Sequence, residues 1–182
     1  MSPSSTLGLA KNRYAALVLA QSPANLVVRM AGFFGGEEKD KNFVGKIIPH
    51  LHGLIRGGTT SYAVGDRIWQ PTYTMDLALN SLLLAARGGG GAYVMASHGE
   101  ASFWELTVEI VRLLGWRNRI EIAQTASENV SKNELGRRPG RAVMRNQRMQ
   151  SEGLDLQRPW QEALGDYLAS DYFTKFRFDT TQ

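Results

Sequence analysis

The chain has 182 residues, of which 43% are apolar, a formal net charge of +4 and no cysteine. This composition allows one hydrophobic core of ordinary size, and the absence of cysteine excludes disulfides, thiolate catalysis and cysteine-based zinc sites. No apolar run approaches the roughly 20 residues that span a bilayer, and no secretory signal follows Met1, so we expect a cytoplasmic protein without a membrane partner. The positive charge favours an anionic partner, either nucleic acid or a small diphosphate.

Hydrophobic patterning predicts helices and strands that alternate along most of the chain. Helices are predicted for residues 8–21, 41–54, 75–87, 101–114 and 160–168, and strands for residues 25–30, 60–64, 69–73, 93–96 and 119–123. Pro49 is expected to kink the second helix or end it early, and residues 142–144 resemble a further strand. The alternation predicts an α/β fold with strands too scattered for one regular doubly wound sheet. The polar segment 125–137 is expected to be a long loop, either over the ligand site or mobile.

The glycine run at residues 88–91 could suggest a phosphate-binding loop. Such loops lead from a strand into a helix, whereas this run leads from a predicted helix into a predicted strand. A helix C-cap followed by a turn is therefore the favoured interpretation. No other glycine cluster fits a dinucleotide fingerprint, so the sequence predicts no independent Rossmann cofactor site within this chain.

The histidines do not form a metal-binding pattern. His50 and His52 would point about 200° apart on a helix, and no carboxylate or third histidine is placed to join them. Packing or surface roles are favoured for both, and no metal site is predicted. His98 lies in a predicted strand-to-helix loop, where a polar contact to a ligand is an open alternative.

An arginine-rich stretch between residues 132 and 148 carries much of the excess charge; it contains Arg137, Arg138, Arg141, Arg145 and Arg148. Clustered cations can bind nucleic acid, but this stretch is interrupted by proline, glycine and an apolar segment rather than by stacking aromatic residues. We therefore expect no nucleic-acid partner. A solvated face and a diphosphate site both stay open, since the planar guanidinium group suits phosphate oxygens.

Six segments match the motifs of one enzyme family in order and spacing. Residues 28–35 resemble V-R-T-S-W-x-Y-G, residues 41–44 are K-N-F-V, and residues 64–78 resemble V-x-D-Q-x-G-S-P-T-Y-x-x-D-L-A. Residues 91–107 resemble G-x-Y-x-x-A-S-x-G-x-x-S-x-x-E-x-A, residues 138–144 resemble R-P-x-x-S-V-L, and residues 159–168 resemble P-W-x-x-A-L-x-x-Y-L. From about Pro3 to Leu168 the chain thus resembles the C-terminal half of the dTDP-4-dehydrorhamnose reductase family, which belongs to the extended short-chain dehydrogenases.

The resemblance implies a fold and a set of binding residues. Residues 1–35 would be the last helix–strand unit of a Rossmann NAD(P)-binding domain, residues 36–172 the mixed α/β lobe that binds the nucleotide sugar, and residues 173–182 a tail. The first five or so Rossmann strands would be missing. The family reduces 4-keto-6-deoxyhexose nucleotides with NADPH or NADH. Carried over by motif, the substrate-binding residues would be Asn42, Arg67, Pro71, Thr72, Tyr73 and Arg138.

The family's Y-x-x-x-K motif is incomplete at residues 7–11. In the family the tyrosine donates a proton to the sugar carbonyl, and the lysine lowers the pKa of the tyrosine and holds the cofactor ribose. Here Leu7 replaces the tyrosine, and Lys11 is the one catalytic and cofactor-binding residue that the resemblance carries over. Leucine has no ionisable proton, so general acid catalysis from this position is impossible. Tyr14 lies one turn beyond Lys11, on the far side from Leu7, and is not expected to replace the lost tyrosine.

Other departures concern the sugar. Gly32 replaces the tryptophan that the family places near the sugar, and Arg67, Trp69 and Gln70 replace glutamine, glycine and serine. The identity of the sugar is therefore not set by the resemblance.

These observations favour a protein that binds a dTDP-hexose-like nucleotide sugar, binds no cofactor by itself and lacks stand-alone hydride transfer. One alternative is an enzyme half that works with an N-terminal Rossmann partner. Another is a non-catalytic regulatory subunit of the methionine adenosyltransferase beta type, which also occurs in this family. Because the strand at residues 26–30 would lack its neighbours from the missing half, self-association through its edge is expected.

Overall fold

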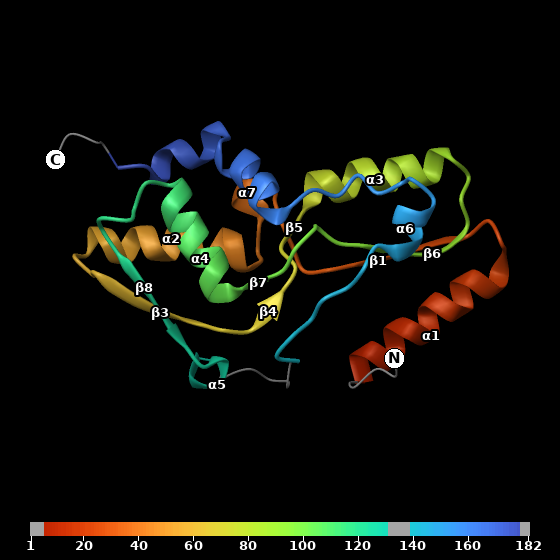
Figure 1. Ribbon diagram of the computed structural model, residues 1–182, viewed down its shortest axis with the longest axis horizontal. Coiled ribbons are helices and arrows are strands. Elements are labelled where there is room, and N and C mark those ends of the chain that lie inside the picture. The colour runs from red at the N-terminus through yellow and green to blue at the C-terminus, as the bar shows by residue number, and fades with distance from the viewer. Residues whose placement is uncertain (1–5, 131–138, 179–182) are drawn as a thin grey trace.

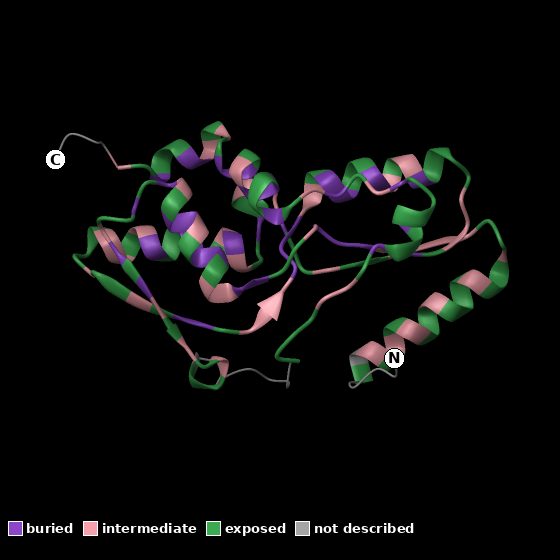
Figure 2. Ribbon diagram, viewed as in Figure 1, coloured by how far each residue is buried: buried purple, intermediate pink, exposed green. Residues whose placement is uncertain are grey.

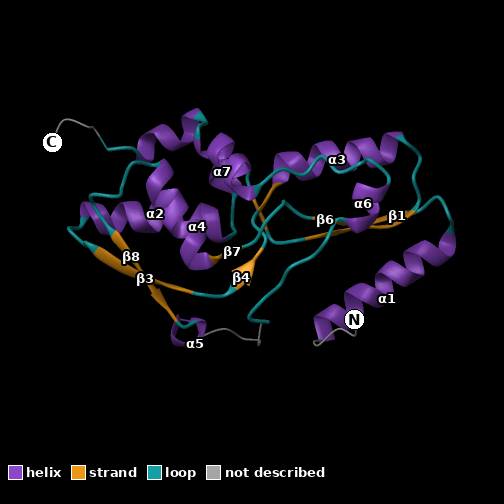
Figure 3. Cartoon of the chain, viewed as in Figure 1, coloured by secondary structure: helices purple, strands orange, loops and turns teal. Residues whose placement is uncertain are grey.

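The computed structural model describes residues 6–130 and 139–178, in which helices and strands alternate as predicted for an α/β fold. Two regions lie next to each other, with α1 and α3 at one end and α2, α4 and α7 toward the other (Figure 1). Each region is built around one pair of parallel strands (Figure 3). None of the helices within residues 6–130 and 139–178 is long and apolar enough to cross a membrane.

The first region, which we call the β1–β6 region, begins the described chain. It comprises α1 (Thr6–Gln21), β1 (Leu26–Met30), α3 (Thr74–Ala86), β6 (Gly91–Met95) and α6 (Gln147–Ser151). The two strands are parallel, with Leu26 opposite Gly91 and Met30 opposite Met95. In Figure 1 the strand pair lies between α3 and α1. Its small core consists of Leu77, Leu84, Tyr93, Met95, Met149 and Leu154.

The second region, the β3–β8 region, contains most of the buried apolar residues (Figure 2). It comprises α2 (Phe43–Arg56), β3 (Ser61–Gly65), α4 (Phe103–Leu113), β8 (Glu121–Thr125), α7 (Trp160–Leu168) and the 3-10 helix η2 (Asp171–Phe176). β3 and β8 are parallel, and a capping box between Ser102 and Glu105 begins α4. The capping box satisfies two backbone donors at the first turn of α4.

Short strands link the two regions. β2 (Phe33–Phe34) pairs in parallel with β5 (Thr72–Tyr73), whereas β4 (Ile68–Trp69) is antiparallel to β7 (Ala101–Ser102). Two further short elements are η1 (Glu37–Lys39) and α5 (Ser127–Val130). Each linking strand has only two residues. They therefore position a few side chains and do not form an extended sheet.

Pro49 does not end its helix early, because it is solvent-exposed and the apolar face of α2 is buried on both sides of it, so packing outweighs one missing hydrogen bond. The alternative, that Pro49 kinks the helix, stays a prediction. Two other local predictions were wrong. Residues 69–73 are not one strand, since β4 and β5 pair with different partners. Residues 142–144 form no strand; an isolated bridge joins Arg141 to Ile68 instead. The segment 125–137 is helical in its first part, at α5, and residues 131–138 lie outside the described part of the chain.

Candidate functional site

Residues 68–72 are hydrogen-bonded to two other segments that the family motifs cover, the loop after β1 and residues 140–142. The Ile68 N–H donates to the carbonyl of Gly140 (2.9 Å), and the Ile68 carbonyl accepts from Ala142 (3.0 Å). The Thr72 N–H donates to the Gly32 carbonyl (3.0 Å) on the loop after β1. The arginine-rich stretch and the loop after β1 therefore meet at one short piece of chain.

A polar cavity of about 460 Å³ opens on one side of this piece. It is lined by Gln70, Ser97, His98, Gly99, Glu100, Arg141, Val143, Met144, Arg145, Asn146, Gln147 and Gln150. The Gln70 side-chain amide donates to the Ser97 carbonyl (3.3 Å) and accepts from the Met144 N–H. The Thr72 hydroxyl accepts from the Ser97 N–H (3.1 Å) behind the cavity wall. These bonds hold the loop after β6 against the segment that follows Gly140.

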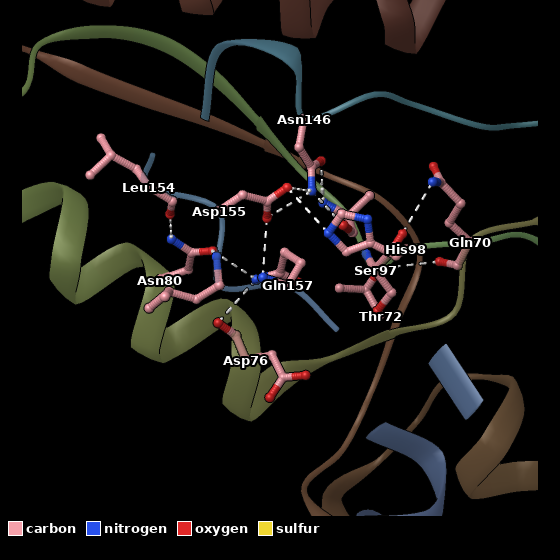
Figure 4. A network of polar contacts seen from close by, with 12 residues as sticks. Gln70, Thr72, Asp76, Asn80, Ser97, His98, Asn146, Leu154, Asp155 and Gln157 are labelled. Carbon is pink, nitrogen blue, oxygen red and sulfur yellow. Dashed lines mark hydrogen bonds and ion pairs between the residues drawn. The ribbon is translucent and has the colours of Figure 1, made fainter. Parts of the chain in front are cut away.

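Asn146 fixes the inner wall of the cavity (Figure 4). Its side-chain oxygen accepts from the Ala96 N–H (3.0 Å), and its amide nitrogen donates to the Ala96 carbonyl (2.7 Å) and to both Asp155 oxygens (3.2 Å). The Asp155 carboxylate lies 3.3 Å from Nε2 of His98. Asn146 is 4% exposed, so its hydrogen bonds form away from water and make the wall rigid.

The polar groups of the cavity suit an oxygen-rich or anionic ligand. Arg141 is paired with Glu100 at 2.6 Å, and both are exposed at the cavity, as is Arg145. The hydroxyl of Ser97 is buried and has no hydrogen-bond partner within residues 6–130 and 139–178. A buried group without a partner is uncommon and is most simply satisfied by a water molecule or a ligand. No group of side chains suited to a metal ion occurs in the same residues.

Three aromatic side chains form a row on the other side of residues 68–72. Trp69 stacks on Phe103, with ring centroids 5.2 Å apart and planes 22° apart, and Phe103 meets Phe43 at 4.5 Å. Phe43 is the first residue of α2, directly after Asn42. We call Trp69, Phe103 and Phe43 the aromatic row. It leads from the loop after β1 to the N-terminus of α2.

None of the carried-over residues that the structure describes lines the polar cavity, and Asn42 and Arg67 adjoin the aromatic row. Asn42 is exposed at the start of α2, and its N–H donates to Asp40 (2.9 Å). Arg67 is half-buried, and its N–H donates to the Ser127 hydroxyl (2.7 Å). Both belong to segments that meet at the aromatic row or at β4, so the structure brings these motifs together.

The other carried-over residues differ in accessibility. Pro71 and Thr72 are buried, and Thr72 contacts the cavity wall through Ser97 and Gln70. Tyr73 is half-buried and stacked on Phe34, and burial is the main cause that raises the pKa of its hydroxyl. Arg138 lies outside the described residues. Lys11 is exposed on α1, far along the chain from the other residues of the set.

Most residues that line the polar cavity stand inside the motifs at residues 64–78, 91–107 and 138–144, but the resemblance assigned a substrate role to none of them. His98 had been kept open as a ligand contact, and it does line the cavity. Ser97 and Gly99 stand inside the motif at residues 91–107, which could have marked them. Asn146 carried no such signal, because its partner Ala96 lies 50 positions away.

The remaining histidines pack against aromatic rings, as predicted. His52 is stacked on Phe178 at 4.9 Å, and His50 meets Tyr62 edge-on at 5.1 Å. Burial, followed by the nearby charge of Arg56, lowers the pKa of His52. Both histidines therefore stabilise the β3–β8 region and are not part of the candidate site.

The chain has the α/β fold of the extended short-chain dehydrogenases. The chain belongs to the family described as the RmlD substrate binding domain, whose family model matches residues 1–173. The resemblance to dTDP-4-dehydrorhamnose reductases is thereby confirmed.

Individual relatives agree with this assignment. The chain is 31% identical over 138 residues to a dTDP-4-keto-6-deoxy-D-glucose reductase of Streptomyces niveus, a match that covers 76% of this chain and 45% of that protein. A solved dTDP-4-dehydrorhamnose reductase of Clostridium acetobutylicum is 28% identical, with a TM-score of 0.78 over 92% of this chain and 56% of that one. The corresponding protein of Bacillus anthracis, solved with NADP, shares the fold at 21% identity and a TM-score of 0.74, over 92% of this chain and 55% of that one. The chain thus spans about half the length of the relatives it matches.

Proposed function

We propose that this chain is the nucleotide-sugar-binding half of a dTDP-4-dehydrorhamnose reductase-like protein, and that by itself it does not transfer hydride. The observation that carries the second part is Leu7, which stands at the family's tyrosine position while Lys11 is kept. A side chain without an ionisable proton cannot protonate the sugar carbonyl. Lys11 can supply at most one contact to the cofactor ribose, and no glycine-rich loop is available for the cofactor phosphates.

Convergence of the substrate motifs supports the binding role. Asn42 begins α2 beside the aromatic row, residues 67–73 run along that row, and Gly140 is hydrogen-bonded to Ile68. Arg138 precedes Gly140 by two positions in the sequence. In this proposal residues 36–172 form the lobe that binds a dTDP-hexose-like ligand. Residues 1–35 belong to the Rossmann domain that holds NADPH or NADH in intact relatives. Phe173 and Phe176 of η2 are buried in the core of the β3–β8 region, so these residues belong to the lobe and not to the expected tail at residues 173–182.

A second candidate function is supported by the exposed side of the β1–β6 region. Within the described residues β1 pairs with β6 alone, so its other edge presents unpaired backbone groups. α1 also exposes Leu9, Tyr14 and Leu17. These surfaces fit an enzyme half that is completed by a separate N-terminal polypeptide. Such a partner would also have to supply the proton donor that Leu7 cannot provide.

Calorimetric titration with dTDP and with thymidine tests the binding role. We expect the wild type to bind dTDP, and Arg138→Ala to weaken that binding about tenfold or more, because a charge-assisted hydrogen bond to phosphate contributes about 1.5–3 kcal/mol. Thymidine binding should hardly change. Arg117→Ala, which removes an exposed arginine elsewhere, is the matched control. The absence of dTDP heat from the wild type would refute the proposed site.

A fluorescence titration with NADPH tests the lack of cofactor binding. We expect neither a micromolar complex nor oxidation of NADPH in the presence of a dTDP-4-keto sugar. Leu7→Tyr alone should not create activity, because the phosphate-binding loop would still be missing. A micromolar NADPH complex of the wild type would contradict the proposal. Activity that appears only when a Rossmann polypeptide is added would favour the second candidate.

A further inference from the structure

Gly32 and Trp69 share one space in the structure. A Cβ atom added at Gly32 would lie 2.5 Å from Cε3 and 2.7 Å from Cζ3 of the Trp69 indole. Real Cβ atoms essentially never approach other heavy atoms this closely, so a side chain at position 32 and an indole at position 69 exclude each other. Trp69 therefore fills the volume that a side chain on the loop after β1 would occupy.

Packing on several sides holds Trp69 in this place. Its ring is stacked on Phe103, and its backbone is paired with Ala101 of β7. The loop that carries Gly32 is tied to the same short piece of chain, because the Thr72 N–H donates to the Gly32 carbonyl. The backbone bonds thus hold positions 32 and 69 close together, and stacking on Phe103 holds the indole in the space beside Gly32.

The family motifs have the same two residue types at positions 32 and 69, but in reversed places. The family pattern that matches residues 28–35 has tryptophan at position 32, and the pattern that matches residues 64–78 has glycine at position 69. This chain has Gly32 and Trp69. Because positions 32 and 69 touch, the two departures amount to one exchange of side chains. A single indole fills the shared space, and in this chain it comes from position 69 instead of position 32. Exchanges that conserve volume are the ones that packed sites tolerate best.

We propose that Trp69 replaces the family's tryptophan as the aromatic wall beside the sugar, and that it determines which hexose this lobe accepts. The inference rests on the proposed nucleotide-sugar binding. The indole enters from β4 and not from the loop after β1, so it presents a different edge to the ligand. Its Nε1 is buried and has no hydrogen-bond partner within the described residues, so a ligand or a water molecule is the simplest partner for it. In this proposal the C–H face of a hexose packs against the part of the indole that Phe103 does not cover.

A stability cycle tests the exchange without any ligand. Gly32→Trp alone should lower Tm by about 5–10 °C, because two indoles cannot share the space. In the Trp69→Gly background the same substitution should be neutral or stabilising. Equal effects of Gly32→Trp in the two backgrounds would overturn the exchange.

Binding measurements test the role in sugar selection, with dTDP and dTDP-glucose as the probes. We expect Trp69→Leu, which keeps an apolar side chain of smaller size, to weaken dTDP-glucose binding about fivefold or more relative to dTDP. The double variant Gly32→Trp/Trp69→Gly should recover part of the loss. Trp104→Leu, which removes a half-buried tryptophan of α4, is the control and should leave the ratio of the two affinities unchanged.

The outcomes separate this inference from the proposed function. If the wild type binds dTDP and Trp69→Leu leaves the ratio unchanged, the role of Trp69 is refuted and the nucleotide site stands. If the wild type binds neither probe, the proposed function fails and the sugar contact of Trp69 fails with it. If Trp69→Leu weakens dTDP and dTDP-glucose binding equally, Trp69 supports the lobe as a whole and does not select the sugar.

Discussion

The two regions of this chain differ in how completely they bury their own apolar surface. The β3–β8 region has a continuous core that includes fully buried Trp116, Leu106 and Leu164. In the β1–β6 region the core is small, and no described side chain of α1 is buried. The β3–β8 region therefore covers its own apolar side chains, whereas the β1–β6 region leaves Leu9, Tyr14 and Leu17 of α1 exposed. The difference predicts that the two regions respond differently to the loss of an apolar side chain.

The largest expected effect is on the free energy of unfolding, when one leucine side chain is shortened in each region. Leu164→Ala should lower the free energy of unfolding by about 2–5 kcal/mol, because the side chain is fully buried and leaves a cavity. Leu17→Ala, at a position that is 55% exposed on α1, should change it by less than about 0.5 kcal/mol. Urea denaturation of both variants measures the difference. Similar losses would show that α1 is packed in solution and would abolish the contrast between the regions.

The second largest expected effect is on self-association of the chain. We expect the wild type to form dimers or larger species through the free edge of β1 and the apolar face of α1, because exposed strand edges and apolar patches pair with other chains. Leu17→Lys should raise the dissociation constant about tenfold, since it places a charge in that face. Sedimentation velocity over a range of concentrations provides the measurement.

A lysine in the other region is the control for that experiment. Val108 is 36% exposed on α4, and Val108→Lys should leave the association unchanged. A wild type that stays monomeric at high concentration would show that the β1–β6 region does not need a cover.

A pH effect on the smaller region should be the weakest of the three. The carboxylate of Glu152 accepts hydrogen bonds from Arg148 and from the hydroxyl of Tyr93, both at 2.7 Å, and these bonds lower the pKa of Glu152. Because the folded pKa lies below the unfolded value of about 4.3, the bonds stabilise the contact between α6 and β6 fully at neutral pH. The stabilisation is lost as the pH falls through the lowered folded pKa.

Hydrogen exchange of the β6 amides at pH 6 and at pH 3 measures this loss. Glu152→Gln should remove the part of the pH dependence that comes from this carboxylate. Glu109→Gln, which breaks a similar surface pair with Arg112 on α4, should leave the exchange of β6 unchanged. Identical pH profiles for the wild type and Glu152→Gln would show that the contact contributes nothing measurable.

Local sequence patterns predicted most helices and strands. The features that they did not predict depend on contacts between residues far apart in the sequence. The helix at residues 160–168 was predicted at its observed bounds, because a proline before it and an amphipathic pattern are local signals. Pro49 predicted a possible early end of its helix, which is wrong because the burial of α2 depends on contacts far along the chain. The division of residues 69–73 into two strands depends on partners at residues 33–34 and 101–102. No local pattern contains that information.

The same limit applied to the candidate site. Family motifs indicated the segments around Asn42 and residues 67–73, and the structure places these segments close together. The roles of Asn146 and Ser97 in the cavity wall were not predicted, because the bonds that place them join Asn146 to Ala96 and the Ser97 N–H to Thr72, 50 and 25 positions away. The contact between Gly32 and Trp69 was equally invisible, although both residues had been noted separately as departures.

The short link between β4 and β5 has a consequence for how this protein can change over evolutionary time. Trp69 belongs to the aromatic row and Gln70 lines the polar cavity, so neighbouring positions serve two different walls, the row and the cavity lining. Successive side chains in an extended chain point to opposite sides, so a deletion or insertion of one residue would turn each side chain away from its wall. Substitutions at these positions can alter the accepted ligand one wall at a time. Changes of length in the link would disrupt both walls together, so we expect homologues to vary here in residue type and not in length.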